Sequence, residues 1–138
     1  MSVNWEQVEE IERQCSAYHA QWVAVTKMQS LEDMNALYQY GKRQFGENKA
    51  QEIERKYPLF PADVQWHFIG HLQRNKVKSI IDKVAYIHSV DSLRLLDTIQ
   101  QEASKIDKKI NVLIQIHIAE EETKYGFSIE EASEFFDQ

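Results

Sequence analysis

The sequence has few of the residues that mark secreted, membrane-bound or loosely linked proteins. Cys15 is the only cysteine among 138 residues, so the chain cannot form an internal disulfide or a two-cysteine zinc site. Four glycines and two prolines leave little room for long flexible linkers. No apolar run approaches the roughly 18 residues of a membrane helix, and no signal core follows Met1. We therefore expect a cytoplasmic protein.

Positive charge is also in short supply. The chain carries 16 Lys and Arg against 22 Asp and Glu, a formal net charge of -6 with a pI near 5.4. This balance argues against non-specific binding to nucleic acid or to an anionic membrane. Hydrophobic residues make up 43% and charged residues 28%, the balance of an ordinary globular protein. We expect residues 1–138 to form a single domain.

Several motifs that mark well-known sites are absent from the sequence. It contains neither a Walker phosphate loop nor a dinucleotide-binding GxGxxG. No two histidines have metal-ligand spacing such as HExxH, so we predict no metal site. Residue order alone assigns no Ser-His-Asp triad, and we name no catalytic residue.

What the sequence does contain is an alternation of short apolar strands and amphipathic helices. The periodicity predicts a helix over residues 3–19 and then five strand–helix units. The strands are expected at residues 21–27, 42–46, 65–70, 85–90 and 110–118. The residues expected to cap the helices are Asn4, Ser30, Asp91 or Ser92, Ser128 and, at a carboxyl end, Gly41. Strands separated by single crossover helices should be parallel.

The first helix carries an apolar stripe that predicts contact with the core. Its members recur at helical spacing and are Val8, Ile11, Cys15 and Tyr18. We therefore expect Cys15 to be an inert, buried thiol.

Two α/β architectures agree with this order of elements. One is an open doubly wound sheet, and the other is part of a (β/α)8 TIM-type barrel, of which five βα units are present. The fifth strand favours the barrel, because one of its faces is made of isoleucine and valine while the other carries Gln115 and His117. A doubly wound sheet is more often apolar on both faces. Both architectures place loop chemistry at the carboxyl ends of the strands.

The first predicted strand ends in a lysine that has a chemical use. Side chains alternate along a strand, so Val23, Val25 and Lys27 share one face, which we expect to be turned toward a packed layer. Burial of a lysine lowers its pKa, and the neutral amine can then form a Schiff base with an aldehyde. Taken alone, the segment favours a solvated lysine at the surface.

Polar residues follow the other strands as well. The carboxyl ends of the predicted strands carry Lys27, Asn48, His67, His71, His88 and His117. Spacing leaves two interpretations of His67 open, a hydrogen-bonded core histidine or a pocket residue. We expect His71 and His88 in loops and the acidic run at residues 120–122 in solvent.

Four ordered phrases together resemble a known family. They are VAVTK ending at Lys27, QFGEN ending at Asn48, WHFIG ending at Gly70 with LQRNK ending at Lys76, and LIQIHI ending at Ile118 with KYG ending at Gly126. The chain resembles the pyridoxal 5'-phosphate (PLP) homeostasis protein family, also called the YggS family, through nearly all of its length. Members of that family resemble the barrel domain of alanine racemase.

The resemblance implies a barrel that holds PLP as a Schiff base on Lys27. Asn48 and His67 match family residues that line the cofactor pocket, and Lys124 matches a lysine of the loop after strand five. The implied function is intracellular PLP homeostasis without catalytic turnover, with PLP-dependent apoenzymes as the recipients of the cofactor. Gln29 stands where the family usually has a second lysine, so no role is carried over for that amine.

Length is the larger departure from the family. A complete barrel needs about eight βα units and this chain has five, so we expect a C-terminally truncated, incomplete PLP-binding domain over residues 1–138. The family's phosphate contacts lie in the last strands, and we name no phosphate-binding residue here. Two alternatives remain, a PLP-dependent amino-acid racemase and a cofactor-free regulatory module. The sequence does not fix the oligomeric state.

Overall fold

Helices and strands alternate through the whole described part of the chain. The computed structural model describes residues 3–118 and 126–136. The strands are β1 (Ala24–Val25), β2 (Gln44–Glu47), β3 (Gln65–Phe68), β4 (Val84–Val90) and β5 (Asn111–Ile114). The α-helices are α1 (Trp5–Ala17), α2 (Leu31–Tyr40), α3 (Ala50–Lys56), α4 (Val77–Ile80), α5 (Leu93–Lys105) and α6 (Ile129–Phe136). Two 3-10 turns, Tyr57–Leu59 and Arg74–Lys76, complete the order.

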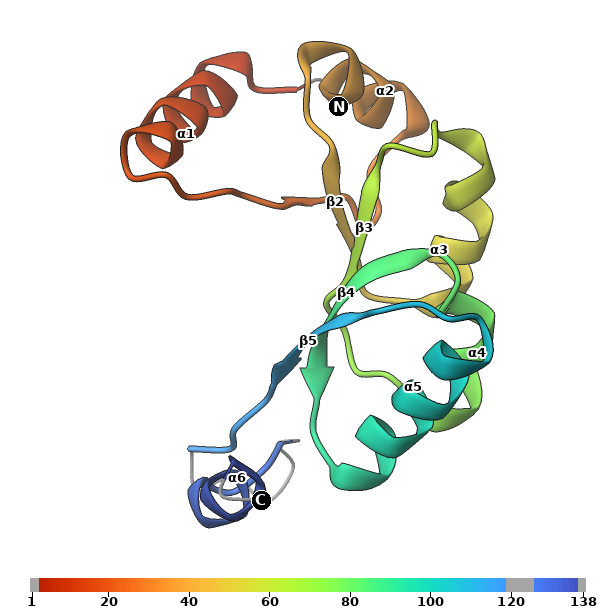
Figure 1. Cartoon of the computed structure of the whole chain (residues 1–138). Helices are drawn as coiled ribbons and strands as arrows, with labels where there is room; N and C mark the ends of the chain where they lie inside the picture. The colour runs from red at the N-terminus through yellow and green to blue at the C-terminus, as the bar shows by residue number, and fades with distance from the viewer. Residues whose placement is uncertain (1–2, 119–125, 137–138) are drawn as a thin grey trace.

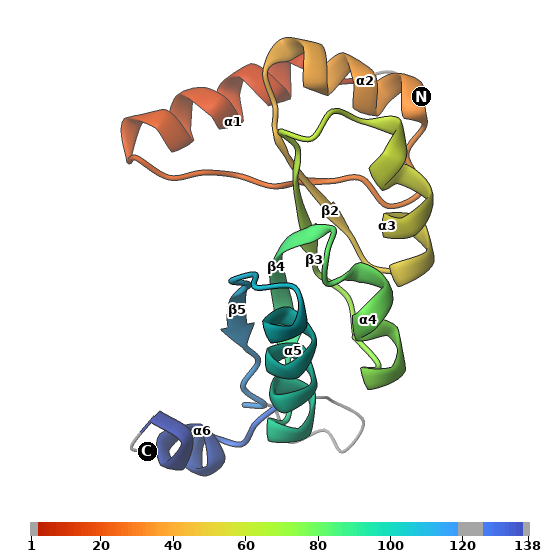
Figure 2. The same cartoon turned by 45° about the vertical axis from the view of Figure 1, so that its right-hand side comes forward.

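The five strands form one parallel sheet in the order β1-β2-β3-β4-β5. A doubly wound sheet reverses its strand order at a switch point, and this sheet does not. Right-handed crossovers in one direction put the connecting helices on the same face, and α2 to α5 lie along one side of the strands (Figures 1 and 2). The predicted partial barrel, an N-terminal helix followed by five βα units, is therefore confirmed.

The hydrophobic core lies between the sheet and these helices. Several strand residues that face the helices are at most 1% exposed, namely Phe45, Trp66, Phe68, Val84 and Ile87. Phe45 and Trp66 pack edge to face, with ring centroids 5.7 Å apart. On the opposite face, the inner face of a barrel, Val25 and Leu113 are each 49% exposed. One face of the sheet is thus packed, and the other carries the side chains available for binding.

The predicted helix boundaries are confirmed by capping hydrogen bonds. Asn4 Oδ1 accepts from Gln7 N, and the hydroxyls of Ser30, Ser92 and Ser128 accept from the amides three residues later. Gly41 ends α2 with φ of 122°, a conformation that glycine adopts without steric cost.

The expected core stripe on α1 was wrong. Only Val8 is buried, while Ile11 is 41% exposed and Tyr18 84% exposed, and Cys15 is only partly covered. A cavity of about 480 Å³ lies between α1, β1 and α2, and Val8 and Ile11 line it. The first two members of the stripe therefore face a space that the described side chains do not fill.

The first and fifth predicted strands lose the most residues in the structure. The first keeps only Ala24 and Val25 in the ladder, and the fifth ends at Ile114, followed by an isolated bridge between Ile116 and Phe127. Lys124 and the acidic run at 120–122 lie outside the described residues. Within the described ranges, no helix combines the length and apolar character needed to cross a membrane.

Candidate functional site

The strand register places the sequence-predicted residues on the inner face of the sheet. Val25 pairs with Gly46, Gly46 with His67, and His67 with Tyr86, so these positions form one layer across four strands. Beyond the paired residues, Lys27 and Asn48 closely follow the neighbouring strands β1 and β2, and His88 continues the inner face of β4, in contact with His67.

Lys27 is exposed rather than packed. The alternation of the first strand holds, but the buried members are Ala24 (8% exposed) and Thr26 (1%), while Val25 and Lys27 lie on the open side. The expected orientation of Lys27 toward a packed layer was therefore wrong. The helices cover the face that carries Ala24 and Thr26, and among the described strands nothing pairs with the outer edge of β1. The Lys27 amine makes no hydrogen bond or ion pair with another described residue.

Lys27 occupies the second position of a tight turn. Gln29 N donates to Thr26 O at 3.1 Å, which closes a four-residue turn directly after the strand. Met28, the third residue, has φ of 59°, a left-handed conformation that is uncommon for a residue with a side chain. The Thr26 carbonyl is therefore the anchor from which the lysine is presented.

Asn48 is held against the end of β3 by a close backbone contact. A Cβ at Gly70 would lie 2.3 Å from Asn48 O, so only glycine allows the two loops to approach as they do. The Ser89 hydroxyl donates to Gly70 O and ties the same loop to β4. Asn48 and His71 help to line a cavity of about 210 Å³ at this end of the sheet.

Gly46 lets two apolar side chains come together over the inner face of the sheet. A Cβ at this position would meet Val23 Cγ1 at 3.1 Å and Ile69 Cδ1 at 3.3 Å. The absence of a side chain produces an apolar floor between β1 and β3, suited to the face of a flat ring.

His67 is nearly buried and both of its ring nitrogens are engaged. It is 3% exposed, its ring stacks on Tyr86 at 4.4 Å, and its Nε2 lies 2.9 Å from Gln44 Oε1. Its Nδ1 lies 2.9 Å from His88 Nε2. Because the amide oxygen only accepts, His67 donates from Nε2, and His88 then donates from its own Nε2 to His67 Nδ1. Burial, followed by the charge of His88, lowers the pKa of His67 to about 4, so this ring is neutral at pH 7.

His88 was misplaced by the sequence argument. It was expected in a loop, but it lies inside β4, on the inner face and in contact with His67. Burial lowers the pKa of His88 as well. The spacing from Tyr86 to His88 is the strand alternation that would have placed both side chains on one face.

The sequence argument also missed a buried ion pair on the helix-facing side of the same strand ends. Lys56 Nζ lies 2.7 Å from Glu47 Oε2, and both side chains are fully buried. Lys56 Nζ also donates to Thr26 O at 3.0 Å. The available signal was the spacing of Ala50, Ile53 and Lys56, which puts the lysine on the buried stripe of α3.

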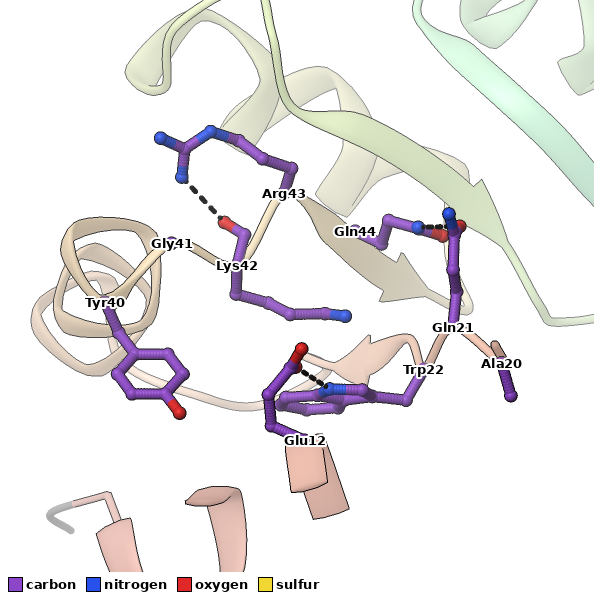
Figure 3. Close-up of a pocket in the computed structure, with 9 residues that line it drawn as sticks. All are labelled: Glu12, Ala20, Gln21, Trp22, Tyr40, Gly41, Lys42, Arg43 and Gln44. Atoms are coloured by element: carbon purple, nitrogen blue, oxygen red, sulfur yellow. Dashed lines mark hydrogen bonds between the residues drawn. The ribbon is translucent and has the colours of Figure 1, made fainter. Parts of the chain in front are cut away.

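Another cavity, of about 500 Å³, lies at the opposite end of β1 and β2 (Figure 3). Lys42 points into it over the Trp22 ring, 4.0 Å from the centroid, and burial lowers the pKa of this lysine. Trp22 Nε1 donates to Glu12 at 2.7 Å and so ties α1 to the chain entering β1. Gln44 connects this end to the inner face, since it bonds both Gln21 and His67.

Among the described residues, no group of three His, Cys, Asp or Glu side chains is arranged to hold a metal ion.

Comparison with known proteins gives consistent results. The family model described as "Alanine racemase, N-terminal domain" matches residues 4–138. A curated relative from Aquifex aeolicus is 40% identical over 119 residues, covering 86% of this chain and 52% of the relative, and one from Escherichia coli is 34% identical over 116 residues, covering 81% and 50%. Both are named pyridoxal phosphate homeostasis protein. The chain thus spans about half the length of these relatives.

A solved structure shares the fold. PipY of Synechococcus elongatus, determined with PLP bound, superposes with a TM-score of 0.76 at 27% identity, covering 92% of this chain and 62% of that one. The resemblance to PLP homeostasis proteins seen in the four sequence phrases is confirmed by these relatives.

Proposed function

Because the chain belongs to the family of alanine racemase N-terminal domains, we propose that it binds PLP at the carboxyl end of its sheet and serves PLP homeostasis. The observation that carries the proposal is an exposed lysine, Lys27, presented by a turn at the end of β1, with Asn48 at the end of the neighbouring strand β2. The names of the curated relatives and the PLP bound to PipY support it.

Lys27 is the residue that we propose for covalent attachment. A C=N bond forms between its Nζ and the aldehyde carbon of PLP, and the aldehyde oxygen leaves as water. The step needs a neutral amine with room to approach the aldehyde. An amine without a hydrogen bond or ion pair to the described residues meets the second requirement. When bound, PLP supplies a reactive aldehyde and an electron-withdrawing ring.

The surroundings of Lys27 fit a flat aromatic ligand. Gly46, Val23 and Ile69 provide an apolar floor on which a pyridine ring can rest. Asn48, at the end of the neighbouring strand, carries a polar amide. We assign His67 to the layer below. Its contact with His88 orients His88, which lies nearer the opening of the site. No described residue is assigned to the phosphate group.

We propose that this site holds PLP for transfer to PLP-dependent apoenzymes rather than for turnover. Racemisation needs a proton donor and acceptor on the two faces of the cofactor. His67 does not serve as a donor, since its pKa near 4 keeps it neutral and both ring nitrogens are engaged. The curated relatives are named for homeostasis and not for racemisation.

The proposal is tested by trapping. Purified chain is mixed with PLP, its absorbance spectrum is recorded, and the mixture is reduced with borohydride and mapped by peptide mass. We expect saturable labelling at Lys27 that Lys27→Ala abolishes. The matched control is Lys78→Ala, which removes an exposed lysine of α4 and should leave labelling unchanged.

Three outcomes would contradict the proposal. Labels scattered over surface lysines, or labelling that survives Lys27→Ala, would remove Lys27 from its role. A folded protein that takes no label would point to the cofactor-free regulatory module. Alanine racemisation that Lys27→Ala abolishes would point to the enzyme.

A further inference from the structure

The buried Glu47–Lys56 pair is the most unusual charged group in the described structure. The two side chains are 2.7 Å apart and fully buried between the sheet and α3. The Thr26 hydroxyl donates to the same Glu47 oxygen and also lies 3.1 Å from Gly46 O. Lys56 donates to Thr26 O as well. Two atoms of Thr26, its hydroxyl and its carbonyl oxygen, are thus tied directly to one ion pair.

Fold stability does not explain why this position is charged. Taking two ions out of water costs about as much as their attraction returns, and apolar residues of similar volume are often as stable. The pair also leaves Glu47 Oε1 with no hydrogen-bond partner among the described residues, which adds a further cost. The reason for the pair therefore lies in the groups that it contacts.

The contacted group is the anchor of the Lys27 turn. Thr26 O accepts from Lys56 Nζ and also from Gln29 N, which closes the turn around Lys27. The ladder of β1 covers only two residues, so few other bonds hold this end of the strand. The turn also contains Met28 in a left-handed conformation, which relaxes unless its ends are fixed.

We propose that Glu47 and Lys56 are positioning residues for Lys27. The Lys56 ammonium fixes the Thr26 carbonyl, and Glu47 fixes the ammonium, so that the turn presents the Lys27 amine toward Asn48 and the Gly46 floor. This inference rests on the proposed function of Lys27. It adds a second pair of residues, on the far face of the sheet, to a site otherwise built on the inner face.

The test separates positioning from stability with an apolar pair. Glu47→Leu combined with Lys56→Met removes both charges at similar volume, and the Thr26 hydroxyl keeps its contact with Gly46 O. We expect the double variant to unfold near the wild-type denaturant midpoint, whereas Lys56→Met alone unfolds earlier because a buried carboxylate loses its counter-ion. Lys78→Met is the matched control for loss of an exposed lysine.

Two readouts report on the turn. The rate of borohydride-trapped labelling at Lys27 should fall about tenfold in the double variant, within the loss of about 100-fold that a misplacement on the order of 1 Å produces. Hydrogen exchange of the Gln29 amide should become faster, while the β3 amides keep their protection. The exchange measurement needs no cofactor.

The possible results decide between the two proposals. Wild-type labelling and wild-type Gln29 protection in the double variant would reduce the pair to a structural role. If the wild-type chain takes no label, the PLP proposal fails, and Gln29 exchange still decides the positioning role. If the Leu–Met pair does not fold, Glu47→Gln with Lys56→Met carries the same expectations and the same test.

Discussion

Gly70→Ala tests how closely the two loops around Asn48 must approach. A Cβ at Gly70 would lie 2.3 Å from Asn48 O and 2.8 Å from both Cα and Cβ of Asn48. Real Cβ contacts essentially never fall under 3.0 Å, so the gap must open by about 0.7 Å, the difference between 3.0 and 2.3. The φ of Gly70 is not in the left-handed region, so this contact is the whole effect.

The new Cβ of Gly70→Ala would clash with backbone atoms, and this determines how much stability is lost. Overpacking costs about 1 to 3 kcal/mol, depending on whether the neighbour can move aside. Asn48 cannot move freely, because the preceding residue, Glu47, accepts from Ile69 N at 2.9 Å through its carbonyl. We therefore expect a loss near the upper end, about 3 kcal/mol. Gly46→Ala adds the same methyl group but meets only the side chains of Val23 and Ile69, and should cost about 1 kcal/mol.

The measurement is urea unfolding followed by tryptophan fluorescence, with Gly46→Ala as the matched control. At a slope of about 1 to 3 kcal/mol per molar urea, the midpoint of Gly70→Ala should fall by about 1 to 3 M. Gly46→Ala should shift it about a third as far. The same proteins are then assayed for trapped PLP. Both variants should label Lys27 more slowly, because the first displaces Asn48 and the second fills the floor.

Two unfolding results would contradict this account of the Gly70 contact. If Gly70→Ala unfolds within about 0.5 kcal/mol of the wild type, the Asn48 backbone is not packed against Gly70. If Gly46→Ala costs more than Gly70→Ala, the inner face at β2 is tighter than the loop contact, and the order of the two costs is wrong.

Three further perturbations have defined outcomes. The folded-state pKa of His67, about 4, lies below its ordinary 6.5, so the unfolded chain takes up the proton first as the pH falls. The free energy of unfolding should then decrease by about 2 kcal/mol as the pH falls from about 6.5 to 4. The decrease should be smaller in His67→Gln. Urea unfolding at several pH values measures both. Trp22→Phe removes the 2.7 Å bond to Glu12, and should cost about 1 kcal/mol and speed hydrogen exchange in α1. Ser30→Ala removes the amino-terminal cap of α2, and should cost about 1 kcal/mol in thermal or urea unfolding.

The architecture could be predicted from the sequence because the packed face of each strand consists largely of apolar residues. Phe45, Trp66 and Ile87 mark successive strands, and capping serines mark the helices between them. Strand order then follows from chain connectivity. Strand lengths could not be predicted, because apolar side chains continue past the last ladder bond, as at Ile116.

The candidate site was predictable only in part, because its residues lie far apart along the chain. Lys27 and Asn48 lie about twenty residues apart, and the family resemblance singled them out, while the register shows that they follow two neighbouring strands. The face shared by Val25 and Lys27 was wrongly expected to be packed, because alternation defines two faces but does not say which one the helices cover. His88 was missed because a polar residue at the end of an apolar run looks like the start of a loop.

The two sides of the sheet carry different types of residue at the strand ends. On the inner side, the proposed PLP site uses the exposed amine of Lys27 and the apolar side chains that meet over Gly46. The helix-facing side at the same level needs groups that hold the backbone, and there the chain places a buried hydroxyl and a buried ion pair where an apolar core would serve stability equally well. Charge on the packed side therefore supports the proposed positioning role, because the buried pair contacts Thr26 at the end of β1, whereas the packed side of β3 carries the buried Trp66 and Phe68.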